Sequence, residues 1–275
     1  MKRLNLGCGS VFHPAWTNLD IVSVSPAVVR FDITKPLPFP DGYFDVVYHS
    51  HVLEHFSRDE GNRFLCEATR VLKKGGIMRV VVPDLEQIVH TYLQKLQNAF
   101  DGDPIAQMDY EWIMIELLDQ TVRTTSGGMM KRYLSCGSIP NLDFIKQRVG
   151  VEAELILNSP PINRAGLLRK LARKSPSYVL SLIHKQVLQT LIWIFGGKRA
   201  LQYYREGAFR NSGEIHQWMY DRFSLCQIMS NLGFIDIGIA SAVTSRIANF
   251  ASFALDELEG KPRKPDSLYI EGIKN

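Results

Sequence analysis

The first residues of the chain combine a short apolar run with a turn that contains two glycines. Residues 4–10 read Leu-Asn-Leu-Gly-Cys-Gly-Ser, and a second apolar run ends at Asp20. Gly7 and Gly9 can take positive φ and carry no Cβ, so the backbone can turn sharply and lie against a ligand. A carboxylate at the end of the neighbouring strand can accept hydrogen bonds from a ribose diol. This pairing predicts a sheet edge that binds a nucleoside.

Strands and helices alternate after this turn. Residues 31–33 end a third apolar stretch, and Tyr43–Tyr48 is typical of a buried strand. The run that ends in Gly75-Gly76 predicts a helix with a glycine stop, followed by a strand over residues 77–82. Such alternation indicates a parallel sheet with helices on its faces. Ligands bind outside the carboxyl ends of the strands in these sheets, which is where Gly7, Asp20, Asp32 and Ser50 fall.

Several short motifs between residues 4 and 85 resemble one family in their order and spacing. They are Asn5-Leu-Gly-Cys-Gly9, Asn18-Leu-Asp20, Asp32, Leu37-Pro-Phe-Pro-Asp41, Phe44-Asp-Val-Val47, Val52-Leu-Glu-His55 and Arg70-Val-Leu-Lys-Lys-Gly-Gly76. This run is similar to the class I S-adenosylmethionine-dependent methyltransferases of the type 11-like family. The resemblance implies an α/β fold, a Rossmann-like sheet of seven strands with the last one antiparallel beside the fifth. It also implies a methyltransferase that uses S-adenosyl-L-methionine as its cofactor.

The resemblance assigns roles to individual residues. It implies that Asn5, Gly7, Cys8 and Gly9 lie under the methionine part of the cofactor, that Asp20 with Ile21 holds the ribose, and that Asp32 with Ile33 flanks the adenine. Ser50 is expected beside them, at the end of the fourth strand. The chain departs from the family where Ser10-Val11 replaces the usual third glycine. The short distance from this loop to Asp20, interrupted by Pro14, predicts a very short first crossover helix.

Three histidines are candidates for catalysis. Methyl transfer mainly requires that the acceptor be aligned with an already activated methyl group, but a hydroxyl acceptor also needs a general base. His51 and His55 follow the fourth strand, close to the expected position of the methyl group. His216 begins a segment, residues 214–221, that resembles related methyltransferases from surface-glycan gene sets. A purely structural role is the competing interpretation for each histidine.

Two other classes of function stay open. His51-Val-Leu-Glu-His55 fits the His-x-x-Glu-His pattern of inverted zinc peptidases, in which two histidines one helical turn apart bind the metal. The surrounding strand, loop and glycine motifs favour the methyltransferase, so no metal site is assigned. The missing third glycine also leaves open a methyltransferase-like fold that binds without catalysing.

The family fold divides the chain into three parts. Residues 1–84 are expected to form the cofactor-binding half of the core, residues 85–213 a helical insertion or lid, and residues 214–275 the rest of the core. Within the insertion, helices are expected over Asp84–Ala99 and Ile105–Val122. The last part predicts a helix over residues 222–231, strands over 233–240 and 267–274 as an antiparallel edge hairpin, and one or two exposed helical turns at 255–260 that serve as structural filler.

Charge within the insertion is uneven. From Leu155 to Arg205 there is no Asp or Glu, and basic residues stand at Arg164, Arg169, Lys170, Arg173, Lys174, Lys185, Lys198, Arg199 and Arg205. Apolar residues at helical spacing over 178–195 predict an amphipathic helix whose apolar face is covered. Three interpretations are open: packing on the core or in a homodimer, peripheral docking on an anionic membrane through residues 164–205, or attraction of an anionic acceptor.

Composition narrows the class of protein. The 275 residues are 45% hydrophobic, enough to bury a large core in one domain with an elaboration. Four cysteines without paired spacing argue against a disulfide framework, and Met1-Lys2-Arg3 leads straight into the first strand without a signal peptide. We therefore expect a cytoplasmic protein, peripheral to a membrane if the basic segment docks there. The expected acceptor is a small molecule or glycan, with a sugar or glycolipid-like hydroxyl favoured over nucleic acid.

Overall fold

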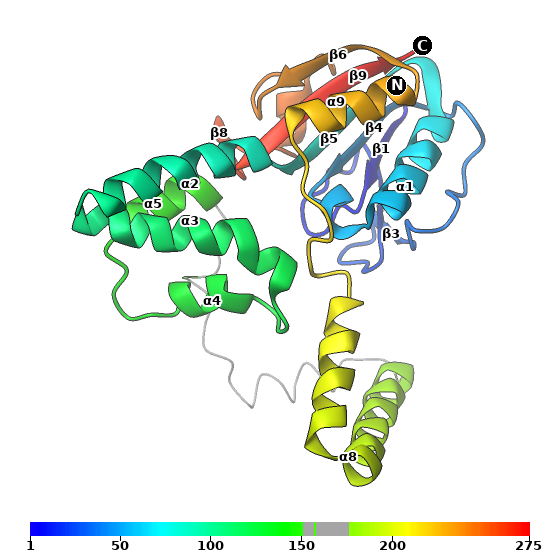
Figure 1. Cartoon of the computed structure of the whole chain (residues 1–275). Helices are drawn as coiled ribbons and strands as arrows, with labels where there is room; N and C mark the ends of the chain where they lie inside the picture. The colour runs from blue at the N-terminus through cyan, green and yellow to red at the C-terminus, as the bar shows by residue number, and fades with distance from the viewer. Residues whose placement is uncertain (151–156, 158–175) are drawn as a thin grey trace.

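A mixed sheet of seven strands forms the centre of the molecule. The computed structural model describes residues 1–150, 157 and 176–275. The strands are β1 (Arg3–Leu6), β2 (Thr17–Asp20), β3 (Val28–Arg30), β4 (Phe44–Ser50), β5 (Leu72–Pro83), β6 (Phe234–Ala240) and β9 (Ser267–Lys274). Their spatial order is β3-β2-β1-β4-β5-β9-β6 (Figure 1). The first five run parallel, and β9 lies antiparallel between β5 and β6. This order confirms the predicted Rossmann-like methyltransferase sheet.

The two faces of the sheet are covered in different ways. On one face, α1 (Arg58–Val71) and α9 (Arg222–Asn231) pack their apolar sides on the strands. Both helices begin with a capping box, Ser57 with Glu60 and Asp221 with Ser224, which satisfies free backbone N–H groups at their first turns. On the other face, a cluster of buried aromatic and aliphatic side chains from residues 242–255 replaces helices. The expectation of helices on both faces is therefore wrong for this face of the sheet.

The segment before β9 corrects a second expectation. Instead of helical turns, residues 257–262 form a small hairpin of β7 (Glu257–Leu258) and β8 (Lys261–Pro262), after the 3₁₀ turn η2 (Phe250–Phe253). Glu259 and Gly260 both have positive φ, as a two-residue hairpin turn of type I′ requires. Leu255 and Asp256, which precede the hairpin, are buried. The start of the segment is therefore part of the core, whereas residues 258–262 of the hairpin are exposed.

Two boundaries near the start of the chain also differ from expectation. α1 ends at Val71, well before Gly75, because the fully buried Leu72 already pairs with Phe44 of β4. Strand pairing thus begins before the glycines that were expected to end the helix. Between β1 and β2 the chain forms turns and no helix, so even the very short crossover helix is absent from residues 7–16.

Helices dominate the described residues of the insertion. α2 (Leu85–Phe100) continues directly from β5, and α3 (Pro104–Val122) packs against it. Their first turns are capped by the side chains of Asp84 and Asp103. α4 (Gly128–Leu134) and α5 (Leu142–Val149) complete a separate small core around the buried indole of Trp112.

The last element of the insertion is α8 (Pro176–Arg210), a helix pair broken at Gly197, where φ is 73°. Its two arms lie side by side, away from the sheet (Figure 1), and Arg205 donates to the Gln189 side chain across them. Most of its apolar side chains from Leu180 onward are exposed within the single chain, and Phe195 is 86% exposed, so the expected covering by a partner or a membrane stays a prediction. Of the predicted basic residues, Arg164, Arg169, Lys170, Arg173 and Lys174 lie outside the described residues. No helix in the described part of the chain has the length and apolar character needed to cross a membrane.

Candidate functional site

A cavity of about 280 Å³ opens at the carboxyl ends of β1 and β4. One wall contains six residues that the sequence predicted for the site: Asn5, Gly7, Cys8, Gly9, Ser50 and His51. The opposite wall, which the sequence did not predict, comes from the end of the chain and includes Leu255, Asp256, Arg263, Lys264, Ser267 and Tyr269. The cavity therefore lies where ligands bind in parallel sheets, and it is closed by the segment expected to be filler.

The glycine turn is held on β2 by its backbone. The N–H groups of Gly7 and Cys8 donate to the Leu19 carbonyl at 2.8 and 3.3 Å, and that of Gly9 donates to Asp20 Oδ2 at 2.8 Å. Both glycines have positive φ, 66° and 54°. A Cβ on Gly7 would lie 2.4 Å from Val52, whereas none of the described atoms lies within 4 Å of a Cβ on Gly9. Gly7 thus serves close packing, and Gly9 leaves open space beside the backbone.

Two lining residues shape the turn from beneath. Asn5 is buried, and its Nδ2 donates to Asn18 Oδ1 at 3.2 Å, so it ties β1 to β2. Burial and the nearby charge of Asp20 raise the pKa of the Cys8 thiol to about 11. Cys8 is therefore a neutral, unreactive thiol at neutral pH.

The predicted nucleoside-binding residues divide into two groups. Asp20 borders the glycine turn and accepts a second backbone bond, from Val22 N at 2.8 Å. Asp32 uses its carboxylate locally, because Thr34 donates from both its hydroxyl and its N–H, and these bonds lower the pKa of Asp32. Ile21 is 62% exposed, and Ile33 packs against the core next to Gly7. None of these four residues lines the cavity, so their roles stay predictions.

The three candidate histidines meet around one buried carboxylate, Glu54. His51 has a positive φ of 53° directly after β4, which turns its ring into the cavity wall. Its Nε2 is 2.8 Å from Ser267 Oγ, and its Nδ1 is 3.2 Å from Glu54 Oε1. Glu54 is completely buried. Glu54 was considered only as part of the His-x-x-Glu-His motif and was assigned no role. Its position between two histidines, next to apolar residues, was the available signal.

His55 and His216 lie on the other side of this carboxylate. Their rings are 4.9 Å apart and edge to face, and His55 Nδ1 is 3.1 Å from the Ile215 carbonyl oxygen. The segment that carries His216 is fixed by Gln217 N, which donates to the Glu54 carbonyl at 2.7 Å, and by His216 N, which donates to the Gln120 carbonyl at 2.9 Å. The cluster therefore joins the core to the insertion.

Burial and charge act against each other in this cluster. Burial raises the pKa of Glu54, but the hydrogen bond from His51 and the positive charges that the three imidazoles can carry lower it to about 2. Burial lowers the pKa of His216 to about 3, more than the Glu54 charge raises it. At neutral pH, Glu54 is thus a carboxylate and His216 a neutral base.

The geometry corrects the zinc-peptidase alternative. That pattern requires two histidines on successive turns of an α-helix, but here the segment is a single 3₁₀ turn, η1 (Leu53–His55). His51 lies before this turn, and both of its ring nitrogens contact side chains, Ser267 and Glu54. His51 and His55 are therefore not presented together as a metal-binding pair.

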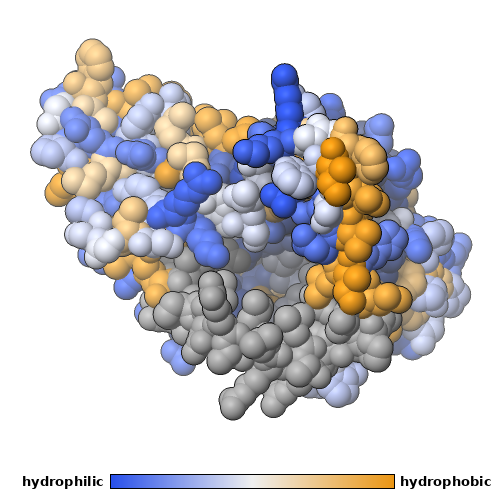
Figure 2. Space-filling view, turned by 90° about the horizontal axis from the view of Figure 1, so that it is seen from below, coloured by the Kyte–Doolittle hydropathy of each residue, from blue (hydrophilic) through white to orange (hydrophobic). Residues whose placement is uncertain are grey.

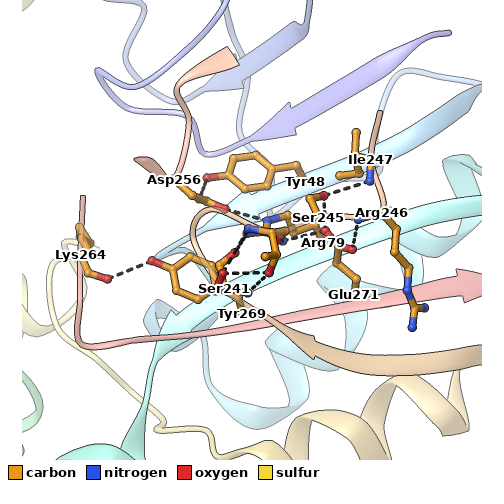
Figure 3. Close-up of polar contacts among 11 residues, drawn as sticks. Tyr48, Arg79, Ser241, Ser245, Arg246, Ile247, Asp256, Lys264, Tyr269 and Glu271 are labelled. Atoms are coloured by element: carbon orange, nitrogen blue, oxygen red, sulfur yellow. Dashed lines mark hydrogen bonds and ion pairs between the residues drawn. The ribbon is translucent and has the colours of Figure 1, made fainter. Parts of the chain in front are cut away.

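A buried ion-pair network supports the wall opposite the glycine turn (Figure 3). Arg79 of β5 lies between Asp256 and Glu271, at 2.7 Å from each, and its other contacts are the carbonyls of Ser241 and Thr244. Tyr48 donates its hydroxyl proton to Asp256. Burial lowers the pKa of Arg79, but the two carboxylates more than reverse this effect and raise it. Charged residues inside apolar strands, Arg79 and Glu271, were the sequence signal for this network.

The first part of the chain matches known proteins in sequence. Residues 4–80 match the sequence model described as the methyltransferase domain. The chain is 34% identical over 92 residues to demethylmenaquinone methyltransferase of Tropheryma whipplei, strains Twist and TW08/27. This alignment covers 30% of the chain and 36% of that relative. The chain thus matches about a third of the relative's length.

Solved structures with similar folds are distant in sequence. An S-adenosylmethionine-dependent methyltransferase from Thermotoga maritima, described as a possible histamine N-methyltransferase, is 13% identical with a TM-score of 0.39; the match covers 100% of this chain and 82% of that chain. One from Archaeoglobus fulgidus is 13% identical with a TM-score of 0.38, over 99% of this chain and 86% of that chain. The fold assignment therefore rests on the strand order of the sheet.

Proposed function

We propose that the chain transfers a methyl group from S-adenosylmethionine to a hydroxyl of an acceptor. The match of residues 4–80 to the methyltransferase domain supports this proposal. The observation that carries the proposal is the cavity, which places the glycine turn and His51 on one wall at the carboxyl ends of β1 and β4. Bound S-adenosylmethionine supplies a methyl group already activated on sulfur. The protein then has to align the acceptor, exclude water and remove one proton.

The residues present fit this cofactor. The open space beside Gly9 allows a ligand to lie against the backbone, where a side chain would obstruct it. Asp20, bound to Gly9 N, stands at the end of β2, where a carboxylate can receive a ribose diol. Asn5 and Cys8 form the floor, and Ser50 borders the cavity at the end of β4.

His51 is the histidine best placed to act as general base. Its contact with Glu54 favours a proton on Nδ1, which leaves Nε2 as the acceptor on the cavity side. Ser267 Oγ, 2.8 Å from Nε2, marks where a hydroxyl hydrogen-bonds to this nitrogen. An acceptor hydroxyl in that position gives its proton to Nε2 while its oxygen takes the methyl group. His55 and His216 do not line the cavity, so we assign them no contact with the acceptor.

The first test is titration of the purified protein with S-adenosylmethionine and S-adenosylhomocysteine. We expect micromolar binding of both, and at least tenfold weaker binding by Asp20→Ala. Because this change also removes two backbone hydrogen bonds, the titration is made well below the melting temperature of the variant. Asp143→Ala, an exposed carboxylate on α5 far from the cavity, is the matched control and should bind as the wild type does. No binding by the wild type would identify a fold that has lost the cofactor.

The second test separates binding from catalysis. Release of S-adenosylhomocysteine is measured with a panel of sugar and glycolipid-like acceptors. We expect His51→Ala to retain cofactor affinity and to lose about 10²–10⁴-fold in turnover, the range for removal of a general base. Unchanged turnover in this variant would remove His51 from the mechanism.

We propose further that α8 docks on an anionic membrane surface, where a glycolipid-like acceptor is available. Trp193 and Phe195 are 52% and 86% exposed at the end of the first arm, and Lys198 and Arg199 follow directly. Figure 2 shows a band of hydrophobic side chains with hydrophilic ones beside it on this side of the molecule. Apolar side chains flanked by basic ones are typical of helices that lie at a charged membrane surface.

Flotation with vesicles of phosphatidylglycerol and phosphatidylcholine tests this docking. We expect the wild type to float with anionic vesicles and the double variant Trp193→Ser, Phe195→Ser to remain in solution. Phe100→Ser is the control, because Phe100 is 87% exposed on α2 without the same basic neighbours. Absence of flotation, or flotation of the double variant, would contradict the proposal. Concentration-dependent mass measurements would then test a second copy of the chain as the covering surface.

A further inference from the structure

We propose that Glu54, His55 and His216 form a binding site for one divalent transition-metal ion such as Zn²⁺. Each of the three offers a ligand atom, and these atoms all lie within 4.8 Å of one another. This set of ligands differs from the His-x-x-Glu-His pattern. It excludes His51 and includes His216, which lies 162 residues after Glu54 in the sequence. It also differs from the proposed methyl-transfer site, since none of the three residues lines the cavity.

The carboxylate of Glu54 has no lysine or arginine partner among the described residues. It is completely buried, and neither oxygen receives a well-aligned hydrogen bond from the described residues; the nearest donor, His51 Nδ1, is 3.2 Å from Oε1. A buried carboxylate is costly unless it is paired with a cation or binds a metal. The described part of the chain places no lysine or arginine in an ion pair with it.

Each of the two imidazoles has one ring nitrogen within 4.8 Å of a Glu54 carboxylate oxygen. The contact of His55 Nδ1 with the Ile215 carbonyl fixes a proton on that nitrogen and leaves Nε2 with its lone pair. A backbone carbonyl bound to the second nitrogen is the usual orienting partner of a metal-binding histidine. His216 is 5% exposed, and its Nδ1 has no hydrogen-bond partner among the described residues. Buried atoms without a hydrogen-bond partner among the described residues, the Glu54 oxygens and His216 Nδ1, thus belong to the same three-residue cluster.

The donor set matches a known class of metal site. Two imidazoles and one carboxylate bind Zn²⁺ at about 2.0–2.2 Å, with a fourth position for water. Ligand atoms within 4.8 Å therefore need to move inward by roughly 1 Å each around such an ion. His55 is only half-buried, which gives the ion a route from solvent. A bound ion would neutralise Glu54 and link η1 to the segment before α9.

The test uses metal content and stability, so it does not depend on methyl transfer or on cofactor binding. Chelator-treated protein is titrated with Zn²⁺ alone, followed by its melting temperature, and with Co²⁺, followed by visible absorption. We expect one ion per chain, a higher melting temperature with metal, and at least tenfold weaker binding by Glu54→Gln and His216→Gln.

Two further variants separate the alternatives. His90→Gln, in which an exposed histidine of α2 is changed, should bind the ion as the wild type does. His51→Gln should also retain binding, because the proposed ligands exclude His51; loss of binding there would favour the His-x-x-Glu-His pattern instead. Circular dichroism of the metal-free variants establishes that they are folded. No bound ion, or equal affinity in Glu54→Gln, would overturn the proposal and leave a proton on an imidazole as the cation.

Discussion

Two clusters of buried charge each contact the cavity through one residue, Asp256 in the first and His51 in the second, and they differ in the source of their positive charge. Asp256 and Glu271 share the guanidinium of Arg79, which fills the space between them and also binds two backbone carbonyls. Glu54 has only imidazoles around it. The first cluster contains its cation within the chain, so it holds the wall rigidly. In the second cluster, the positive charge has to come from a proton or an ion taken from solution. The net charge of this cluster therefore depends on the solution conditions.

The largest expected effect comes from removal of the cation in the first cluster. Arg79→Met leaves two buried carboxylates without a partner, and we expect a loss of about 3–5 kcal/mol in the free energy of unfolding, measured by urea denaturation. The triple variant Arg79→Met, Asp256→Asn, Glu271→Gln should recover a large part of that loss. A loss below about 1 kcal/mol in the single variant would mean that the network contributes little.

A smaller effect is expected from the hydroxyl that completes the network. Tyr48→Phe removes one hydrogen bond to the buried carboxylate of Asp256 without a change of shape. The expected loss is about 1.5–3 kcal/mol, typical of a hydrogen bond to a charged group. Tyr203→Phe, on the exposed surface of α8, should change stability by less than about 0.5 kcal/mol. Equal effects of the two variants would argue against a buried charge at Asp256.

The corresponding change in the second cluster should have a different outcome. Glu54→Gln removes a buried carboxylate whose pKa is lowered by the imidazoles around it, so in metal-free protein we expect a loss in the free energy of unfolding that is smaller than that of Arg79→Met. The variant should also lose the stabilisation that Zn²⁺ gives to the wild type. Urea denaturation with and without metal measures both. A loss as large as that of Arg79→Met would show that Glu54 has a cation within the chain.

The smallest effect concerns carboxylates whose partners are exposed. The Lys73 ammonium and the Lys2 N–H lower the pKa of Asp45 from its ordinary value of 3.8. Because the folded pKa is depressed, the pair stabilises the fold at neutral pH, and this contribution is lost as the pH falls below about 4. Asp45→Asn should therefore lose about 0.2–1 kcal/mol at pH 7 and nothing further in acid. An equal difference between wild type and variant at pH 3 would contradict this assignment.

Short sequence patterns were sufficient to predict those features that depend on residues close together in the chain. The glycine turn and the start of α2 at Asp84 follow from spacing within short stretches, and the strand order of the core was implied by the resemblance to the methyltransferases. The helical turns predicted at residues 255–260 were wrong, because the position of Asp256 depends on its ion pair with Arg79, 177 residues away in the sequence. Charge alone made this segment look exposed.

The site shows the same limit. Spacing identified His51 and His55, but their relation to His216 depends on a loop that returns over 160 residues of chain. The role of Glu54 follows from its complete burial, which the sequence could not reveal. The exposed apolar face of α8 was expected to be covered. Amphipathic periodicity indicates that such a face is buried against a partner, but it does not identify the partner.

The two walls of the cavity come from opposite ends of the sequence, the glycine turn from residues 5–11 and the facing wall from residues 255–269. During synthesis at about 5–20 residues per second, the second wall leaves the ribosome on the order of ten seconds or more after the first. The turn therefore spends this interval without its opposite wall, while the insertion folds between them. A ligand enclosed by both walls cannot assist the early steps of folding. Such a ligand can bind only after residue 269 has been synthesised and the two walls have come together.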